Sequence, residues 1–334
     1  MIVNFNGHDV IERCLDAVEA QTVAPVRTIV VDNASTDGSV EMVAARFPHV
    51  ELVRLERNVG FAAGNNYAAR LAADCDWLAL LNADAFPEPG WLEALLRAAR
   101  ENPGYSFFAS RILRADDPGE IDGTGDVYHV GGMAWRRDNG RRASDRHRPR
   151  GDIFSACAAA ALYPRELFLD VGGFDERFFC YYEDTDLALR LRLRGHRCLY
   201  EPDAVVHHVG FASAGSESSF TVYHSQRNIV WTYVKNMPGV LVWAYLPQHL
   251  LVNALNIGWY SLRGRARPVL RSKLDALRGL PHTLRERRAV QGHRSAGALE
   301  LRRLMARGLG PYSTGVKRAL ASRHAESRPL EQVR

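Results

Sequence analysis

The sequence predicts an α/β protein with a mainly parallel central sheet, flanking helices and a C-terminal helical region. Residues 1–100 alternate short β-branched, apolar runs with helical patterns, and this alternation is typical of a parallel sheet covered by helices. Two of the strand-like runs end in polar side chains, as in VVDNASTDGS at residues 30–39. Because ligands of open α/β sheets bind at the carboxyl ends of the strands, these ends are candidate site positions.

The first hundred residues divide into four strand and four helix patterns. Strands are expected at Met1–Phe5, Arg27–Val31, Glu51–Leu55 and Trp77–Leu81. Helices are expected near residues 9–20, 38–46, 63–73 and 90–100. With 46% hydrophobic residues in a chain of 334, the composition is ample for a core.

The next hundred residues are less regular. Strands are expected at 106–113 and 153–163, joined by a basic, turn-rich segment at 135–152 that is expected to be a mobile loop. Residues 187–194 alternate leucine and arginine, which fits a strand by period alone. Leu, Ala and Arg are strong helix formers, however, and Gly195 is a natural stop, so we expect a helix there.

The distribution of charge indicates the kind of partner the protein binds, and the cysteines indicate its compartment. Residues 263–334 contain 18 Lys and Arg against 5 Asp and Glu, while the rest of the chain is net acidic. Such a basic segment indicates an anionic partner, either a membrane surface or a nucleic acid. The five cysteines form no CxxC pair, which favours reduced thiols in the cytoplasm. No signal peptide is expected, because the opening MIVNF already has a strand pattern.

An uncharged stretch lies at residues 239–262, flanked by Lys235 and Arg263. Its length would span a bilayer. It contains Pro247, Gln248, His249, Asn253 and Asn256, however, so the favoured expectation is a helical hairpin that packs on the rest of the protein or lies in a membrane interface.

Two common phosphate-binding motifs are absent from the sequence. The first strand–helix turn, NFNGHD, has one glycine rather than GxGxxG, and no GxxxxGK[ST] string occurs. Hydride transfer and ATP hydrolysis therefore lack their usual loops. The polar groups at the strand ends remain. Asp32 can accept hydrogen bonds from a nucleobase or ribose, or it can simply form a turn. Asp84 can bind Mg²⁺ or Mn²⁺, which commonly use one or two carboxylates together with substrate phosphates.

Several motifs in order resemble one family. VNFNG, VVDNASTDGS, NVGFAAGNN, LLNADA, VGGFDERFFCYYEDTDLALR and HSQRN are similar to those of family 2 glycosyltransferases, and most of all to the rhamnosyltransferase-like branch. The resemblance covers residues 1–235. It implies a GT-A fold, a nucleotide-diphosphate sugar donor, a divalent metal (Mg²⁺ or Mn²⁺) and inversion at the anomeric carbon.

Motif positions in this resemblance imply roles for individual residues. The residues implied to bind the nucleotide sugar are Asp32, Asn33, Asn58, Asn65, Asn82 and Arg227. Asp84, the last acid of a DxD-type motif, would hold the metal together with His207 or His208; the first position of that triplet is Asn82, which leaves one certain carboxylate. Asp184 matches the catalytic base, although an aspartate there can also cap a helix. Glu183 is the neighbouring candidate, and like charges so close can raise a pKa.

These expectations combine into one function. The chain is expected to be an inverting glycosyltransferase that moves a sugar, L-rhamnose as the best single guess, from a dTDP- or UDP-sugar to a cell-surface glycan or polyprenyl-diphosphate-linked acceptor. Residues 1–215 would form the catalytic domain, with the nucleotide-sugar half at 1–100 and the acceptor half at 101–215. Tyr181 or Tyr182 is expected near the acceptor. Residues 216–334 would form a basic helical region that holds the enzyme peripherally on the inner face of the cell membrane.

Two other functions remain open at this point. A nucleotidyltransferase can have the same kind of α/β sheet with polar strand ends, but its first loop is usually glycine-rich and basic, unlike NFNGHD. A nucleic-acid-binding protein would use the basic tail, but that tail lacks interleaved aromatic residues, and no nucleic-acid partner is expected. The oligomeric state is left open.

Overall fold

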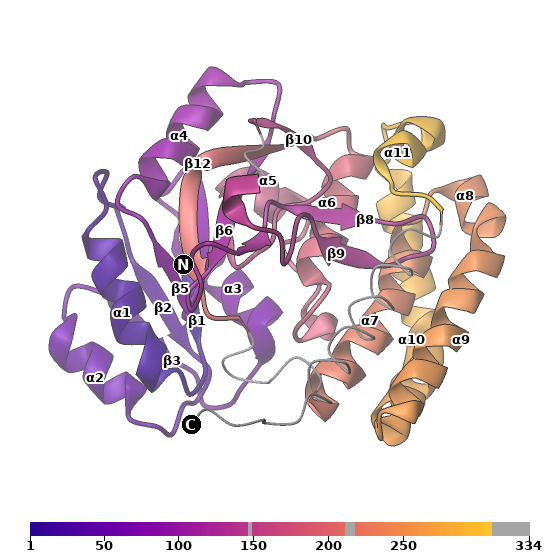
Figure 1. The fold of residues 1–334 in the computed structure, drawn as a ribbon, viewed down its shortest axis with the longest axis horizontal. Helices are drawn as coiled ribbons and strands as arrows, with labels where there is room; N and C mark the ends of the chain where they lie inside the picture. The colour runs from indigo at the N-terminus through magenta and orange to yellow at the C-terminus, as the bar shows by residue number, and fades with distance from the viewer. Residues whose placement is uncertain (146–148, 211–217, 309–334) are drawn as a thin grey trace, which may run out of the picture.

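A mixed β-sheet runs through the centre of the protein in a computed structural model that describes residues 1–145, 149–210 and 218–308 (Figure 1). Its strands lie in the order β10-β12-β6-β11-β4-β1-β2-β3, with β5 beside β12 and β7 beside β6. The bounds are β1 (Ile2–Asn4), β2 (Ile29–Asp32), β3 (Glu51–Arg54), β4 (Trp77–Asn82), β5 (Ala85–Pro87), β6 (Phe107–Arg114), β7 (Ile121–Gly123), β10 (Gly151–Ile153), β11 (Ala160–Pro164) and β12 (Cys198–His208).

The N-terminal half follows the predicted alternation. Strands β1 to β4 pair in parallel, β1 lying between β2 and β4. The helices between them are α1 (His8–Glu19), α2 (Ser39–Arg46), α3 (Gly60–Leu71) and α4 (Trp91–Glu101). All eight predicted elements of residues 1–100 are confirmed. Asp37 in the polar turn after β2 accepts hydrogen bonds from the backbone N–H groups of His8 and Ser39, and so caps the starts of α1 and α2.

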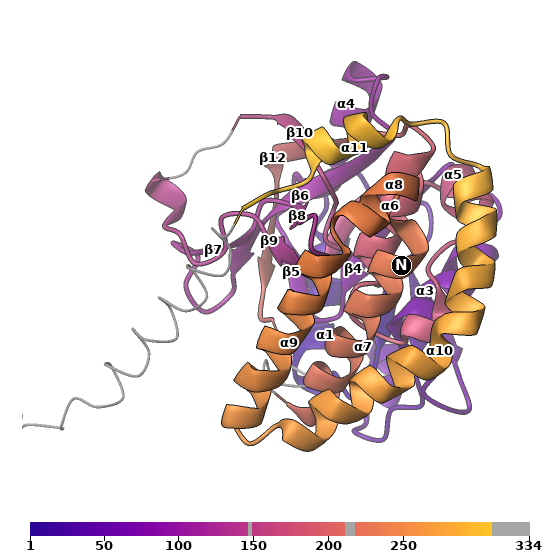
Figure 2. The same ribbon diagram turned by 90° about the vertical axis from the view of Figure 1, so that its right-hand side faces the viewer.

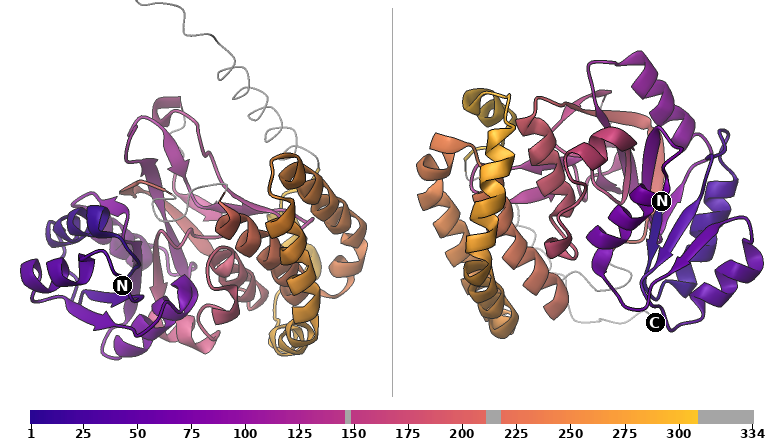
Figure 3. Two further views of the ribbon diagram at one scale, coloured as in Figure 1. Left: turned by 90° about the horizontal axis from the view of Figure 1, so that it is seen from below. Right: turned by 180° about the vertical axis from the view of Figure 1, so that it is seen from behind.

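Helices cover both faces of the sheet (Figure 3). One core cluster joins the sheet to α1, α2 and α4 through residues such as Leu15, Val43 and Leu95. The second cluster joins it to α3, α5 (Arg165–Asp170) and α6 (Glu183–Leu193) through residues such as Ala68, Phe168 and Leu187. The helix predicted at residues 187–194 is therefore confirmed, and its leucines are buried.

The second half of the sheet departs from the prediction in two places. The strand expected at 153–163 is two strands, because β10 ends at Ile153 and β11 begins at Ala160. Between them the backbone N–H of Ala158 donates to a side chain, Asp184, instead of to a neighbouring strand. The expectation of a mobile loop at 135–152 is also wrong at its start, because β9 (Ala134–Arg136) pairs with β8 (Asp126–Tyr128).

The C-terminal helices stack on the side of the molecule away from α1 and α2 (Figures 1 and 3). They are α7 (Ser219–Asn236), α8 (Gly239–Ala244), α9 (Leu246–Leu262), α10 (Ala266–Gly292) and α11 (Ala298–Leu304). The uncharged stretch at 239–262 forms α8 and α9, with Pro247 in the first turn of α9. Within the described ranges, none of the helices combines the length and hydrophobicity needed to cross a membrane.

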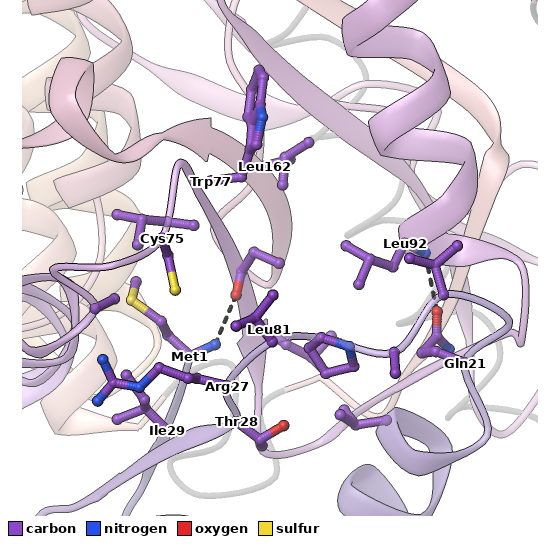
Figure 4. Close-up of a pocket in the computed structure, with 18 of the residues that line it drawn as sticks. Met1, Gln21, Arg27, Thr28, Ile29, Cys75, Trp77, Leu81, Leu92 and Leu162 are labelled. Atoms are coloured by element: carbon purple, nitrogen blue, oxygen red, sulfur yellow. Dashed lines mark hydrogen bonds between the residues drawn. The ribbon is translucent and has the colours of Figure 1, made fainter.

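A cavity of about 310 Å³ lies at the amino ends of the parallel strands, where Met1, Arg27, Cys75 and Trp77 line it (Figure 4). Its lining is mostly apolar, and the N-terminal amino group of Met1 donates to the carbonyl oxygen of Ala79 inside it. The polar strand ends singled out from the sequence lie at the opposite edge of the sheet.

Candidate active site

The carboxyl ends of β1, β2 and β4 meet at one edge of the sheet. Asn4 stands opposite Asp32 in the β1–β2 ladder, and Asn82 stands opposite Val3 in the β1–β4 ladder. Asp32 is only 2% exposed, and its Oδ1 accepts hydrogen bonds from Asn4 Nδ2 (2.9 Å) and Ser35 Oγ (2.5 Å). Its Oδ2 accepts from the backbone N–H of Ser35 at 2.9 Å. Hydrogen bonds from Asn4 and Ser35 therefore hold the Asp32 carboxylate in a tight turn at this edge of the sheet.

The amides that follow this turn hold the start of α3. Asn33 is buried, donates from Nδ2 to the carbonyl of Gly60 and accepts the backbone N–H of Val59. Asn58 accepts the backbone N–H of Gly60 at 2.8 Å. Asn65 lies one turn further along α3, where its Nδ2 donates to the carbonyl of Phe61. The three asparagines thus line the helix start next to Asp32.

The loop that precedes α6 in the chain is strained and contacts the start of α3. Phe179, Tyr181 and Tyr182 all adopt positive φ, at 66°, 69° and 69°. Such non-glycine conformations cost of order 1–3 kcal/mol each and persist only where the surroundings enforce them. The carbonyl of Phe179 accepts the backbone N–H of Ala62 at 3.1 Å. A Cβ on Gly60 would lie 2.6 Å from that carbonyl oxygen, so only glycine allows this approach.

Side chains of helix α7 hold the backbone of this loop in place by hydrogen bonds. Asn228 is fully buried and donates from Nδ2 to the carbonyls of Phe178, Cys180 and Tyr181. Arg227 donates from Nη2 to the carbonyls of Arg177 and Phe178. The guanidinium of Arg227 also stacks on Trp231, 4.5 Å from the ring centroid. These contacts place Arg227 against the loop backbone.

Asp84 and His208 face each other across the end of the sheet. His208, the last residue of β12, places Nε2 3.2 Å from Asp84 Oδ1 and Nδ1 2.8 Å from Asp122 Oδ2. Burial lowers the pKa of His208, but its two carboxylate partners outweigh burial and raise it. Burial raises the pKa of Asp84, but the hydrogen bond and charge of His208, a backbone hydrogen bond and the charge of Arg136 together outweigh burial, so this pKa is lowered.

The neighbouring His207 points elsewhere, because successive side chains of a strand point to opposite faces. Its Nε2 lies 3.0 Å from Glu88 Oε1, and the side chain is partly exposed. The structure therefore brings His208, and not His207, beside Asp84. Asn82 also belongs to this group, since its Nδ2 lies 3.4 Å from His208 Nε2. The Oδ1 of Asn82 is buried without a hydrogen-bond partner.

Arg136 supplies positive charge to the acids around it. It forms an ion pair with Asp122, and its charge lowers the pKa of Asp84 and of Asp184. Burial lowers the pKa of Arg136, but nearby Cys157 and the carboxylates of Asp122 and further acids raise it overall. Arg136 therefore stays charged, and its positive charge acts on both Asp84 and Asp184.

Asp184 is in the first turn of α6 and is partly buried. Its Oδ2 accepts the backbone N–H of Ala158 at 3.2 Å, and its Oδ1 accepts that of Thr185 at 2.6 Å. Burial raises the pKa of Asp184 despite these hydrogen bonds. The residue that precedes the helix is Tyr182, so Asp184 is not its N-cap. Glu183 is 5% exposed, its Oε2 has no hydrogen-bond partner, and burial raises its pKa well above the ordinary value.

A second carboxyl group lies beside Asp184. Oxygens of Asp126 and Asp184 and the Sγ of Cys157 lie within 4.8 Å of one another. Burial, and then the charge of Asp184, raise the pKa of Asp126 well above its ordinary value. Burial likewise raises the pKa of the Cys157 thiol. Asp126 and Cys157 therefore lose their protons less readily than exposed groups of the same kind, and they lie directly beside Asp184.

Sequence reasoning missed four residues of this site, namely Asp122, Asp126, Arg136 and Asn228. Asp122 and Asp126 lie in DGTGD, a string with the composition of an exposed turn. Arg136 lies in a basic segment, where a charge usually indicates a solvated surface. Asn228 was part of the quoted HSQRN motif, but only its contact with three carbonyls shows what its side chain does.

Known proteins share this chain's sequence and fold. The model of "Glycosyl transferase family 2" matches residues 1–172. The chain belongs to this family. Over 255 residues this glycosyltransferase is 30% identical to the N-acetylglucosaminyl-diphospho-decaprenol L-rhamnosyltransferase of Mycobacterium tuberculosis, an alignment that covers 69% of this chain and 81% of that relative.

Solved glycosyltransferase structures share the fold at low sequence identity. GalNAc-T7, solved with UDP, GalNAc and Mn²⁺, superimposes with a TM-score of 0.56 at 17% identity and covers 70% of this chain and 47% of that chain. Mannosyltransferase PcManGT from Pyrobaculum calidifontis, solved with GDP-Man and Mn²⁺, gives 0.51 at 20% identity and covers 87% and 83%. The expected GT-A fold is confirmed. The C-terminal helices add to it.

Proposed function

We propose that this glycosyltransferase moves L-rhamnose from a dTDP- or UDP-sugar to a hydroxyl of a polyprenyl-diphosphate-linked glycan or a cell-surface glycan. The Mycobacterium tuberculosis relative, whose name describes L-rhamnose transfer onto a decaprenol-diphosphate-linked sugar, supports this sugar and this acceptor. The observation that carries the proposal is that Asp84 is joined through His208 and Asp122 to Arg136, whose positive charge also acts on Asp184. Asp84 can then hold the metal that binds the diphosphate, while Asp184 accepts the proton of the attacking hydroxyl.

Residues of the first hundred would bind the donor. In this proposal Asp32 and the asparagines beside it, Asn33, Asn58 and Asn65, form the nucleotide side of the site, and Asn82 lies near the sugar diphosphate. Asp32 keeps a turn conformation in the free protein, so its role includes shaping the pocket as well as accepting a hydrogen bond from the nucleoside. Arg227 acts as a positioning residue, because its guanidinium already binds loop carbonyls. The acceptor half would comprise residues 101–215.

Asp84 and His208 are proposed to hold the divalent metal, Mg²⁺ or Mn²⁺. Their donor atoms face each other, and Asp122 binds the far ring nitrogen of His208. A carboxylate in that position commonly orients a histidine toward a metal. The partnerless Oδ1 of Asn82 is one further oxygen at the same place. A metal bound there supplies positive charge that offsets the charge developing on the departing diphosphate.

Asp184 is proposed as the general base. The acceptor hydroxyl gives its proton to the Asp184 carboxylate while its oxygen forms a bond to the anomeric carbon. The bond from that carbon to the diphosphate oxygen breaks on the opposite face, the electron pair leaves with the nucleoside diphosphate, and the configuration inverts. A positioned base contributes about 10²–10⁴-fold to the rate. The raised pKa of Asp184 makes it a stronger base than an exposed aspartate.

Glu183 is less suited to the same task. It is 5% exposed whereas Asp184 is only partly buried, and burial raises the pKa of Glu183 well above the ordinary value. Tyr181 remains the proposed acceptor contact, because it is partly exposed and its hydroxyl reaches Thr221 on α7.

The reaction product tests this function. Purified enzyme is incubated with Mn²⁺, a panel of dTDP-, UDP- and GDP-sugars and a polyprenyl-diphosphate-linked acceptor, and the released nucleotide is identified. We expect nucleoside diphosphate, released fastest from dTDP-rhamnose and only when acceptor is present. Release of pyrophosphate would indicate nucleotidyl transfer, and no release from any donor would contradict the proposal. A cytoplasmic enzyme bound to the inner face of the membrane would meet such an acceptor.

A further inference from the structure

The outward face of α8 and α9 is apolar along its whole length. Trp243 is 74% exposed and Leu262 is 86% exposed, and the exposed residues of α9 between them are also apolar. We call this stripe the apolar ridge; its large side chains are Trp243, Leu250, Leu251, Leu255, Trp259 and Leu262. The ridge covers successive turns of one helix and is larger than the scattered exposed leucines of an ordinary soluble surface.

The most deeply buried polar side chain of α9 faces the protein. His249 is 4% exposed, stacks on Tyr233 and places Nδ1 2.9 Å from the carbonyl of Gly131. Asn253 donates from Nδ2 to the carbonyl of His249 within the helix. A surface helix in water normally turns its polar side chains outward, whereas the exposed residues of α9 are apolar. Its outer face therefore fits an apolar environment.

Helix α10 lies beside α9 and continues this surface (Figure 2). Leu270, Leu274 and Leu277 are 53%, 47% and 61% exposed, and they recur at the spacing of one helix face. The exposed Arg267 and Arg271 stand among them. Residues 239–304 contain 12 Lys and Arg against 3 Asp and Glu. The ridge is therefore flanked by positive charge.

We propose that the apolar ridge and the arginines of α10 dock on the surface of an anionic lipid bilayer, with the ridge at the boundary of headgroups and acyl chains. Amphipathic helices with Trp and Leu on one side and arginine beside it bind membranes in this way. A second copy on the same face would bring arginines against arginines, whereas anionic headgroups complement them. Because the described helices do not span a membrane, the contact is peripheral.

This docking adds a membrane contact to the proposed function, and the biological purpose of the docking rests on that function. The turn between α9 and α10 lies at the same end of the molecule as the carboxyl ends of β1 and β2 (Figure 1). A membrane that touches this turn brings a lipid-linked acceptor to the end of the protein where the candidate site opens.

Vesicle flotation tests the docking without donor or acceptor. The wild-type chain is mixed with vesicles of phosphatidylcholine alone or with added phosphatidylglycerol. We expect binding to the anionic vesicles that weakens with salt. Leu251→Asp and Leu255→Asp should each reduce the bound fraction about tenfold or more, because each places a charge in the lipid contact. Val26→Asp is the matched control: Val26 is 85% exposed in the loop before β2, and its replacement should leave binding unchanged.

Fluorescence locates the ridge in the bilayer. Brominated lipids should quench the wild-type emission, and Trp259→Phe with Trp243→Phe should remove that quenching. No binding of the wild type to anionic vesicles, or equal binding of the Leu251→Asp variant with an unchanged melting temperature, would overturn the proposal. A wild-type dimer that Leu251→Asp dissociates in light scattering would also overturn it. Transfer to a detergent-soluble acceptor reports the proposed function separately, and these variants should retain it.

Discussion

His208 places Nε2 3.2 Å from Asp84 Oδ1 while its other ring nitrogen is bound by Asp122. The two partners come from distant parts of the chain: Asp84 follows β4 and His208 ends β12. The strand pairing that joins β12 to β5, with His208 opposite Ala85, sets their distance. The proposed metal site is therefore a property of the sheet as a whole, and it can be tested one ligand at a time.

Replacing His208 by alanine should weaken Mn²⁺ binding, and His207→Ala should not. His208 offers a nitrogen beside Asp84, whereas His207 points to Glu88. We expect a loss of at least about 10–100-fold in Mn²⁺ affinity for His208→Ala. Titration calorimetry of Mn²⁺ in the presence of UDP or dTDP measures it. Equal effects of the two substitutions would show that the sheet does not select between the two histidines.

Replacing Asp184 by asparagine should lower the rate of transfer by about 10²–10⁴-fold, because the amide keeps the shape but cannot accept the hydroxyl proton. Glu183→Gln is the matched control. Glu183 is buried and its pKa is raised well above the ordinary value, so a neutral amide of the same size should reduce the rate by much less than Asp184→Asn does. Initial rates at saturating donor make the comparison. A larger loss in Glu183→Gln than in Asp184→Asn would exchange the assigned roles.

The pH dependence of the reaction should report Asp184. Burial raises the pKa of Asp184, and the base must be ionised, so activity should fall as pH decreases through a pKa above the ordinary value of about 4. Burial and the charge of Asp184 raise the pKa of Asp126 well above its ordinary value, so we expect Asp126→Asn to leave this acid limb in place. The pH profile of kcat/KM for the two proteins provides the measurement. A shift of the limb to lower pH in Asp126→Asn would mean that Asp126 carries charge.

Replacing Arg136 by glutamine should destabilise the fold. Its removal leaves Asp122 and the acids around it without their compensating charge. The pair is partly buried, so breaking it should cost more than the roughly 1 kcal/mol of a surface pair and less than the roughly 3–5 kcal/mol of a fully buried one. Arg141→Gln in the same basic segment should cost less than about 1 kcal/mol, because the side chain of Arg141 is 54% exposed. Urea unfolding followed by circular dichroism measures both. Similar stabilities would refute the central place given to Arg136.

These two arginines show where sequence reasoning stops. The strands, helices and polar strand ends of residues 1–100 follow from local patterns, and the eight elements predicted there are confirmed, whereas the short strand β5 was not predicted. The position of Arg136 depends on long-range pairing: β9 turns back on β8 and carries the arginine toward Asp122. The choice between His207 and His208 likewise depends on the pairing of β12 with β5, which places His208 opposite Ala85, and counting residues along the chain could not decide it.

The loop before Asp184 depends on long-range contacts in the same way. Three carbonyls of this loop accept hydrogen bonds from Asn228 while Phe179, Tyr181 and Tyr182 adopt positive φ, which no aromatic residue favours on its own. A local pattern therefore could not predict this geometry. The motif resemblance pointed to the right segments, and the packing of α7 gives the physical reason that their residues lie together.

Nucleotide binding by two variants separates the proposed roles of Asp84 in metal binding and Asp184 in base catalysis. The affinity for UDP and dTDP is measured with and without Mn²⁺ in Asp84→Ala and Asp184→Asn. We expect Asp184→Asn to bind as tightly as the wild type, whereas Asp84→Ala should lose the part of the affinity that depends on Mn²⁺. Equal losses in both variants, or no loss in Asp84→Ala, would contradict the division of work between the two acids.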